Sequence, residues 1–138
     1  MRTILPVLAV LLAGAGLAQA PAYELTGSVS QVMIRIIYPS SDALFYIERS
    51  PPKTEVEWNA IRNQALTLAE SGNLLLLPGR APDSGDWTKD AKMMMAAARA
   101  AYKAALAKDM AGILAQSDAL TQSCVACHRR YRPDYGKK

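Results

Sequence analysis

The sequence is poor in the side chains that build most metal sites. Its 138 residues include two cysteines and one histidine. A structural zinc site usually takes four cysteine or histidine ligands, so these side chains are too few to form one by themselves. No long run of like charge is present although the formal net charge is +4, and nothing in this pattern indicates nucleic acid as a partner.

The sequence also lacks an apolar run long enough to span a membrane. An apolar stretch over 4–17 is interrupted by proline and glycine, whereas a spanning helix needs roughly 20 apolar residues. Arg2 before this stretch and the small residues at 18–20 after it are typical of a secretory signal peptide. We expect cleavage after Ala20, export to the periplasm, and a mature chain of residues 21–138 that forms one domain without a membrane span.

Strand patterns are missing as well. Apolar residues recur at steps of three and four, which is the period of one helix face. They do so in four segments, which predicts an all-α fold, an antiparallel four-helix bundle. The expected helices cover about 26–38 with a continuation through Ile47, then 54–72, 86–106 and 109–131.

Proline, glycine and capping residues set the expected boundaries. Pro39 lacks a backbone donor and disfavours helical geometry at the residue before it, so the first helix should kink or stop there. Thr54, followed three residues later by a glutamate, has the spacing of a capping box, and Gly72 is expected to end that helix. Asp86 is the expected N-cap of the third helix, and 73–85 is then a loop.

The third segment has an inner face made largely of alanine, which allows another helix or a flat, bulky group to come close. Its members are Trp87, Ala91, Met94, Ala98, Ala101 and Ala105. The fourth segment repeats steps of three and four through Met110, Ile113, Ser117, Leu120, Cys124, Cys127 and Tyr131. Both cysteines of the protein therefore fall on its core-facing side.

The pattern C-x-x-C-H is formed by Cys124, Cys127 and His128. A disulfide here would close a very short loop and add little stability, and a thioredoxin-like pair would need a strand-to-helix junction. The same pattern is the signature of covalent haem attachment, in which the thiols form thioethers and the histidine binds the iron. One histidine then means one haem c, whose sixth iron position is a methionine, a weaker ligand such as lysine, or open.

With Tyr131 and Arg132 after the histidine, the motif resembles that of the class II c-type cytochromes, the family of cytochrome c′, typically written C-x-x-C-H-x-x-[FY]-R. The resemblance implies a four-helix bundle with the haem near the end of the last helix. It also implies a distal residue on the first helix, which is a methionine in the low-spin branch of the family. Met33 is by this resemblance the candidate sixth ligand, and packing in the core is its alternative role.

Other residues around the expected haem have weaker support. Met93, Met94 or Met95 could compete with Met33 for the iron. Family members often carry an arginine that meets a haem propionate one turn before the distal residue, but Val29 stands at that position here. Arg35 is a weak substitute, and Arg132 is a candidate for a propionate or proximal contact, with a helix-end charge as the alternative.

The resemblance implies a periplasmic monohaem cytochrome that transfers electrons to and from unidentified redox partner proteins. Arg129, Arg130 and Lys137 belong to a basic cluster that could dock an acidic partner, or could simply be a solvated helix end. Dimers are common in the family, so a homodimer is compatible. The alternative function is a five-coordinate haem that binds nitric oxide or carbon monoxide. We do not expect an enzyme, because peroxidase chemistry usually needs a second, distal histidine.

Overall fold

The computed structural model describes residues 23–136, and within them the backbone is helical with no β-strand. The prediction of an all-α fold is therefore confirmed. The expected signal peptide, 1–20, lies outside the described residues. The elements are α1 (Val29–Val32), the π-helix η1 (Met33–Ile37), α2 (Tyr38–Phe45), the 3₁₀ turn η2 (Ile47–Arg49), α3 (Glu55–Leu76), α4 (Asp86–Leu106), α5 (Met110–Leu114) and α6 (Ser117–Tyr131).

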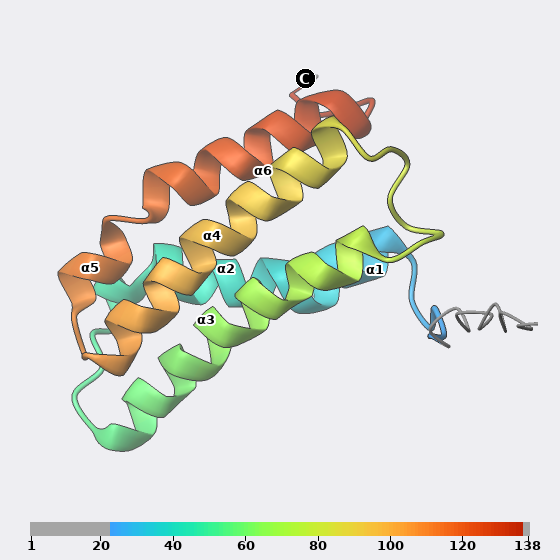
Figure 1. Ribbon diagram of the computed structural model, residues 1–138. Coiled ribbons are helices and arrows are strands. Elements are labelled where there is room, and N and C mark those ends of the chain that lie inside the picture. The colour runs from blue at the N-terminus through green and yellow to red at the C-terminus, as the bar shows by residue number, and fades with distance from the viewer. Residues whose placement is uncertain (1–22, 137–138) are drawn as a thin grey trace, which may run out of the picture.

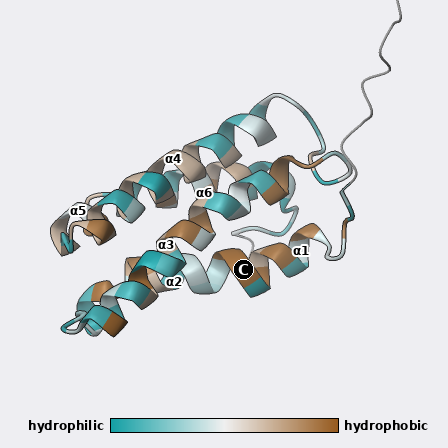
Figure 2. Ribbon diagram, turned by 60° about the horizontal axis from the view of Figure 1, so that its bottom comes forward, coloured by the Kyte–Doolittle hydropathy of each residue, from teal (hydrophilic) through white to brown (hydrophobic). Residues whose placement is uncertain are grey.

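The helices pack in a bundle-like arrangement in which α4 lies between α3 and α6, and α2 also packs against α3 (Figure 1). Hydrophobic and hydrophilic residues alternate around α3 and α4, as expected for helices with one buried side (Figure 2). The predicted inner face of α4 is buried along its whole length, and Ala98, Ala101 and Ala105 are completely buried. These small side chains allow the neighbouring helices to approach closely.

The first helical region does not stop at Pro39. Ser28 caps its start through a capping box with Gln31, and the helix continues through the proline to Phe45. The helix is therefore not interrupted at the proline, and a π-helical stretch precedes it. A wider turn of this kind can accommodate a residue that lacks a backbone donor.

The prediction that Gly72 ends the second helix is wrong, although the capping box at its start is confirmed. Helix α3 continues to Leu76, two residues before Pro78, so only 77–85 remain as a loop. A Cβ atom on Gly72 would overlap the side chain of Met95. The glycine is therefore needed for the close contact between α3 and α4, and not for a turn.

Two further boundaries differ from the prediction. Asp86 is the first residue of α4, whose first turn is capped by Asp83, which accepts a hydrogen bond from the backbone N–H of Trp87 at 3.2 Å. The fourth predicted helix is divided into α5 and α6 by a turn at 115–116. Asp109 is the N-cap of α5, where its side chain accepts from the backbone N–H of Gly112.

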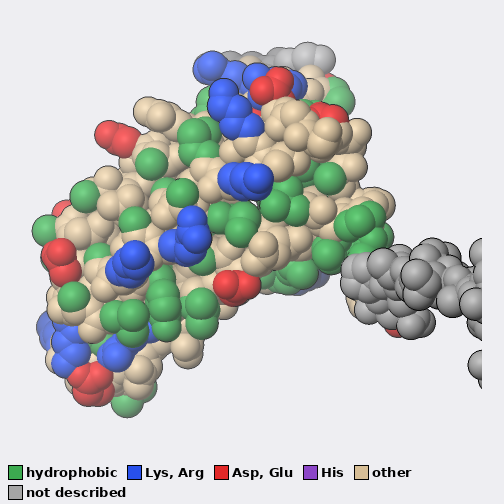
Figure 3. Space-filling view, viewed as in Figure 1, with side chains coloured by type: hydrophobic (Ala, Val, Ile, Leu, Met, Phe, Trp, Pro, Cys, Tyr) green, Lys and Arg blue, Asp and Glu red, His purple; other side chains and the backbone are tan. Residues whose placement is uncertain are grey.

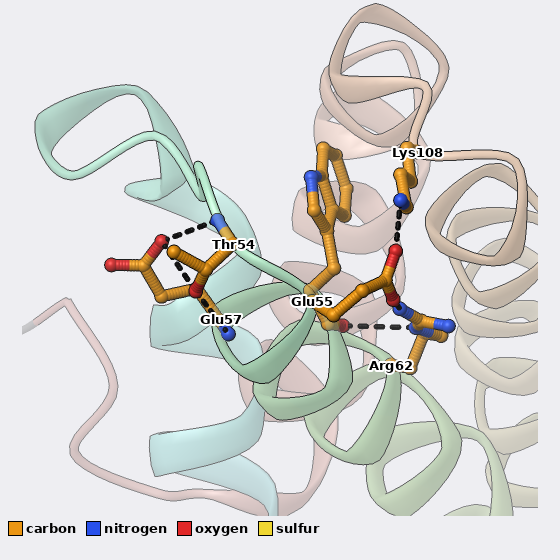
Figure 4. Close-up of polar contacts among 6 residues, drawn as sticks. Thr54, Glu55, Glu57, Arg62 and Lys108 are labelled. Atoms are coloured by element: carbon orange, nitrogen blue, oxygen red, sulfur yellow. Dashed lines mark hydrogen bonds and ion pairs between the residues drawn. The ribbon is translucent and has the colours of Figure 1, made fainter.

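The start of α3 is tied to the turn after α4 through one carboxylate (Figure 4). Glu55 pairs with Arg62 at 2.7 Å and with Lys108. The hydrogen bond from Lys108, and then that from Arg62, lowers the pKa of Glu55. Glu55 and Lys108 are largely exposed, so these pairs orient the turn more than they stabilise the fold.

Candidate functional site

The described residues enclose a cavity of about 820 Å³ between α6 on one side and the α1–η1–α2 region on the other. Its inner wall is formed by buried residues of α4, among them Trp87, Ala91 and Met94. Ile34 and Tyr38 lie at its outer edge and are 62% and 66% exposed. This volume is within the range of roughly 300–1,000 Å³ that is usual for pockets that bind small molecules.

Helix α6 brings the three residues of the cysteine motif to the cavity. Positions three and four apart lie on the same face of an α-helix, so Cys124, Cys127 and His128 share the face that lines it. Both cysteines are free and partly buried. The turn before them is held in the core by Leu120, which is 2% exposed, and by Ser123, whose hydroxyl donates to the Leu120 carbonyl at 2.7 Å.

The surroundings of the motif favour the uncharged forms of its side chains. Burial raises the pKa of the Cys124 thiol. Burial, with the nearby Asp90 charge, raises the pKa of Cys127 to about 11. Burial, together with the positive charge of Arg132, lowers the pKa of His128. At pH 7 the imidazole is therefore neutral, which is the form that can bind a metal ion.

The opposite side of the cavity contains Met33, which is partly buried on η1. Met94 lines the cavity as well, from the inner wall. Met93 and Met95 are not among the lining residues, and Met95 packs against Gly72. Two of the four methionines considered from the sequence therefore meet at this cavity.

The two predicted arginines differ in position. Arg132 is exposed and lines the edge of the cavity, next to His128. Arg35 is exposed on η1 and is not among the lining residues. The structure thus brings Arg132 to the site with the motif and leaves Arg35 outside it.

A buried carboxylate at the cavity was missed in the sequence. Asp90 lines the cavity from α4, is 4% exposed, and accepts a hydrogen bond from the Arg130 guanidinium at 3.1 Å. Arg130 also pairs with Asp86 at 3.3 Å. Asp90 stands three residues after Trp87 and four before Met94, so a single acidic residue on an otherwise apolar helix face was the available indication.

These contacts also bear on the predicted basic cluster. Side chains of both signs gather where α6 ends and α4 begins (Figure 3). Arg130 is engaged by two carboxylates there, while Arg129 and Arg132 are exposed. Lys137 lies outside the described residues. The positive charge available to a partner is therefore smaller than the sequence suggests.

Tyr131 links the cavity wall to the loop before α4. Its ring packs edge-to-face against Trp87, with centroids 5.0 Å apart, and its hydroxyl donates to Asp83. The Trp87 indole N–H in turn donates to the Leu75 carbonyl at 2.8 Å. Tyr131 and Trp87 both line the cavity, so this chain of contacts holds three helices and a loop in place around it.

Tyr131→Phe is expected to destabilise the protein most at neutral pH and progressively less in alkali. The bond to Asp83 raises the pKa of Tyr131 to about 12. An ionised phenol cannot donate this bond, so its contribution is full below the unfolded-state pKa of about 10 and is lost as the pH rises toward the folded-state value. The difference in urea midpoint between wild type and variant should therefore shrink above pH 10.

Tyr23→Phe, which removes a hydroxyl from an exposed residue that does not line the cavity, is the matched control and should leave the midpoint unchanged. A wild-type advantage over Tyr131→Phe that stays constant from neutral pH into strong alkali would contradict the role given to this hydrogen bond.

Within residues 23–136, no cluster of three or more His, Cys, Asp or Glu side chains is arranged to hold a metal ion. None of the helices described is both long enough and apolar enough to cross a membrane. Comparison of the chain with family models, with curated proteins and with solved structures found no match. The chemistry of the cavity must therefore be argued from its own side chains, which offer two thiols and an imidazole on one side and a thioether on the other.

Proposed function

We propose that this protein is an electron-transfer cytochrome that carries one covalently bound haem c in the cavity between α6 and η1. The observation that supports the proposal most is that a single cavity collects Cys124, Cys127 and His128 from the last helix and Met33 from the first helical region, about ninety positions away in the sequence. Met33 and Cys127 also pack against the hydrophobic core, so the support comes from the shared cavity together with the cysteine and histidine motif.

The lining residues fit a haem. Cys124 and Cys127 would hold it through thioether bonds, and His128 would bind the iron from the same helix. Met33 would supply the sixth ligand, and Arg132 at the edge would pair with a propionate. Because the porphyrin supplies four iron ligands itself, only one or two protein side chains are needed, and no larger cluster of ligating residues is required.

When bound, the haem supplies an iron centre that accepts and releases one electron. The chain contributes the ligands and the environment. His128 and Met33 as iron ligands would raise the reduction potential, and burial against the inner wall of α4 would tune it further. Residues such as Trp87 and Ala91 exclude water from this wall, since they are about 95% buried.

The rest of the proposal follows the resemblance to the class II c-type cytochromes. It places this haem domain in an antiparallel four-helix bundle of residues 21–138, exported to the periplasm after cleavage at Ala20. Redox proteins would be its partners, and we propose no catalytic activity. The exposed arginines beside the cavity, Arg129 and Arg132, are the basic groups that an acidic partner would meet first.

The proposal is tested by expressing the full chain in a host that matures c-type cytochromes and recording its mass and optical spectra. We expect one haem per chain that survives denaturation, and a low-spin spectrum in both oxidation states without rapid carbon monoxide binding. A protein without covalent haem would overturn the proposal. A high-spin spectrum with ready carbon monoxide binding would replace electron transfer by the alternative, gas binding at a five-coordinate iron.

A further inference from the structure

The first helical region lines the cavity with an unusual spacing. Its lining residues are Val29, Met33, Ile37, Ser41 and Phe45, each together with the residue that follows it. The repeat is therefore four residues throughout, and not the 3.6 residues of a regular α-helix.

A repeat of four cannot stay on one face of a regular α-helix for this distance. Each step of four overshoots a full turn by about 40°, so Val29 and Phe45 would point about 160° apart. A π turn contains about one extra residue, which rotates the part of the helix that follows back by about 100°. The angle between Val29 and Phe45 then falls to about 60°. That angle fits within an apolar face, which is about 100° wide or more. The π-helix η1 therefore lets both halves of this helix face the same cavity.

Pro39 lies two residues after the end of η1. The backbone N–H of Tyr38 donates to the Met33 carbonyl, five residues back, as a π-helix requires. In a regular α-helix the proline ring would clash with the carbonyl four residues before it, that of Arg35. Beyond the proline, Ser40 and Leu44 are 1% exposed, and the Ser40 hydroxyl donates to the Gln64 side chain on α3 at 3.0 Å. The second half of the helix is thus held on α3, and the first half packs there through buried Val32, so a change of register would rotate the two halves relative to each other.

We propose that Pro39 is a positioning residue that holds η1 in the π register and thereby directs Met33 into the cavity. The assignment of Met33 as an iron ligand rests on the proposed function, but the orientation of its side chain does not. Replacement of Pro39 by alanine removes the clash with the Arg35 carbonyl and restores a backbone donor. The π turn then becomes a regular α-helical turn. This rotates Met33 by about 100° relative to α2, so that its side chain no longer faces the cavity.

The test uses the haem-loaded full chain with ¹³C-methyl-labelled methionine, as wild type, Pro39→Ala and Pro39→Ser. Pro51→Ala, in the exposed stretch before α3, is the matched control. Hydrogen-bond scalar couplings report whether the Tyr38 N–H is bound to Met33 or to Ile34. Haem ring-current shifts of the Met33 methyl group, recorded in the diamagnetic ferrous or ferrous carbon monoxide form, report whether it faces the haem. Ferric optical spectra report ligation.

In wild type and Pro51→Ala we expect the Tyr38 N–H to bind the Met33 carbonyl and the Met33 methyl signal to be strongly shifted. In both Pro39 variants we expect the Ile34 acceptor, loss of that shift, and a mostly high-spin iron. The proposal would be overturned if the Tyr38 N–H still bound the Met33 carbonyl in the Pro39 variants. It would also be overturned if this N–H bound Ile34 but the Met33 methyl shift stayed the same. Failure of both variants to fold would also overturn it, because Pro39 would then support the fold as a whole. A high-spin wild type with a shifted Met33 methyl would reject the ligand assignment and support the positioning role.

Discussion

Met33→Ala is expected to convert a six-coordinate, low-spin haem protein into a high-spin one that binds carbon monoxide readily. Met33 is the methionine of the first helical region, and its side chain lines the cavity that also contains His128. Alanine has no sulfur, so the iron position that faces η1 would become open. The spectrum of the ferric protein and the rate of carbon monoxide binding to the ferrous protein would measure the change.

The size of the effect follows from competition within the protein. If Met33 occupies the iron for more than about nine-tenths of the time, an external ligand finds an open site in less than about one-tenth of the molecules. Removal of this competitor should raise the apparent affinity for carbon monoxide by at least about tenfold. The reduction potential should fall, because a methionine ligand raises it.

Met94→Ala is the matched control, because Met94 also lines the cavity and is 5% exposed. Loss of a buried methionine side chain costs about 2–5 kcal/mol of stability, but the low-spin spectrum should persist. If the Met94 variant became high-spin and the Met33 variant did not, the sixth ligand would come from the inner wall of α4. If neither changed, both assignments would be wrong.

Replacement of both cysteines, Cys124→Ala with Cys127→Ala, is expected to abolish covalent haem attachment. Mass spectrometry of the purified chain should show the loss of one haem mass, and any residual haem should be extracted by acidified organic solvent. Each single variant keeps one thiol and should retain haem through one thioether, at a lower yield. The double variant should also be much less stable, because the buried wall of α4 would lose the group packed against it.

The same variants separate haem attachment from a structural disulfide. Both cysteines are free in the structure, and a bridge over two intervening residues would constrain little of the unfolded chain. If the cysteines formed a structural disulfide, the wild-type protein would be colourless and the cysteine variants would differ from it only slightly in stability. The control is Val125→Ala, which lies between the two cysteines and leaves the motif intact. Covalent haem that persists in the double variant would contradict the assigned role of the thiols.

Local patterns allowed much of the fold to be predicted. The three- and four-residue spacing identified the buried face of α4, and the capping box at Thr54 located the start of α3, because both depend on residues within one or two turns. Gly72 shows the limit of such reasoning. A glycine can end a helix or allow a close contact, and only the position of Met95 on the neighbouring helix decides between these roles.

The candidate site also has one part that the sequence predicted and another that depends on how the helices pack. Cys124, Cys127 and His128 are adjacent in the sequence, so their shared helix face follows from helical geometry alone. Asp90 and Trp87 could not be assigned to the same cavity, because their place in it depends on how α4 packs against α6. Pro39 was expected to kink or stop a helix; the helix continues through it after a π turn, so only the stop is excluded.

The sequence by itself determined the helical class, the position of the cysteine motif on the last helix and the resemblance on which the haem proposal rests. Only the tertiary structure decided that Met33 and the residues beyond Pro39 face one cavity together with that motif. The physical reason is that local spacing specifies how side chains are arranged around one helix axis. The rotation of one helix relative to another depends on distant contacts, such as that between Ser40 and Gln64, and on the extra residue in the π turn.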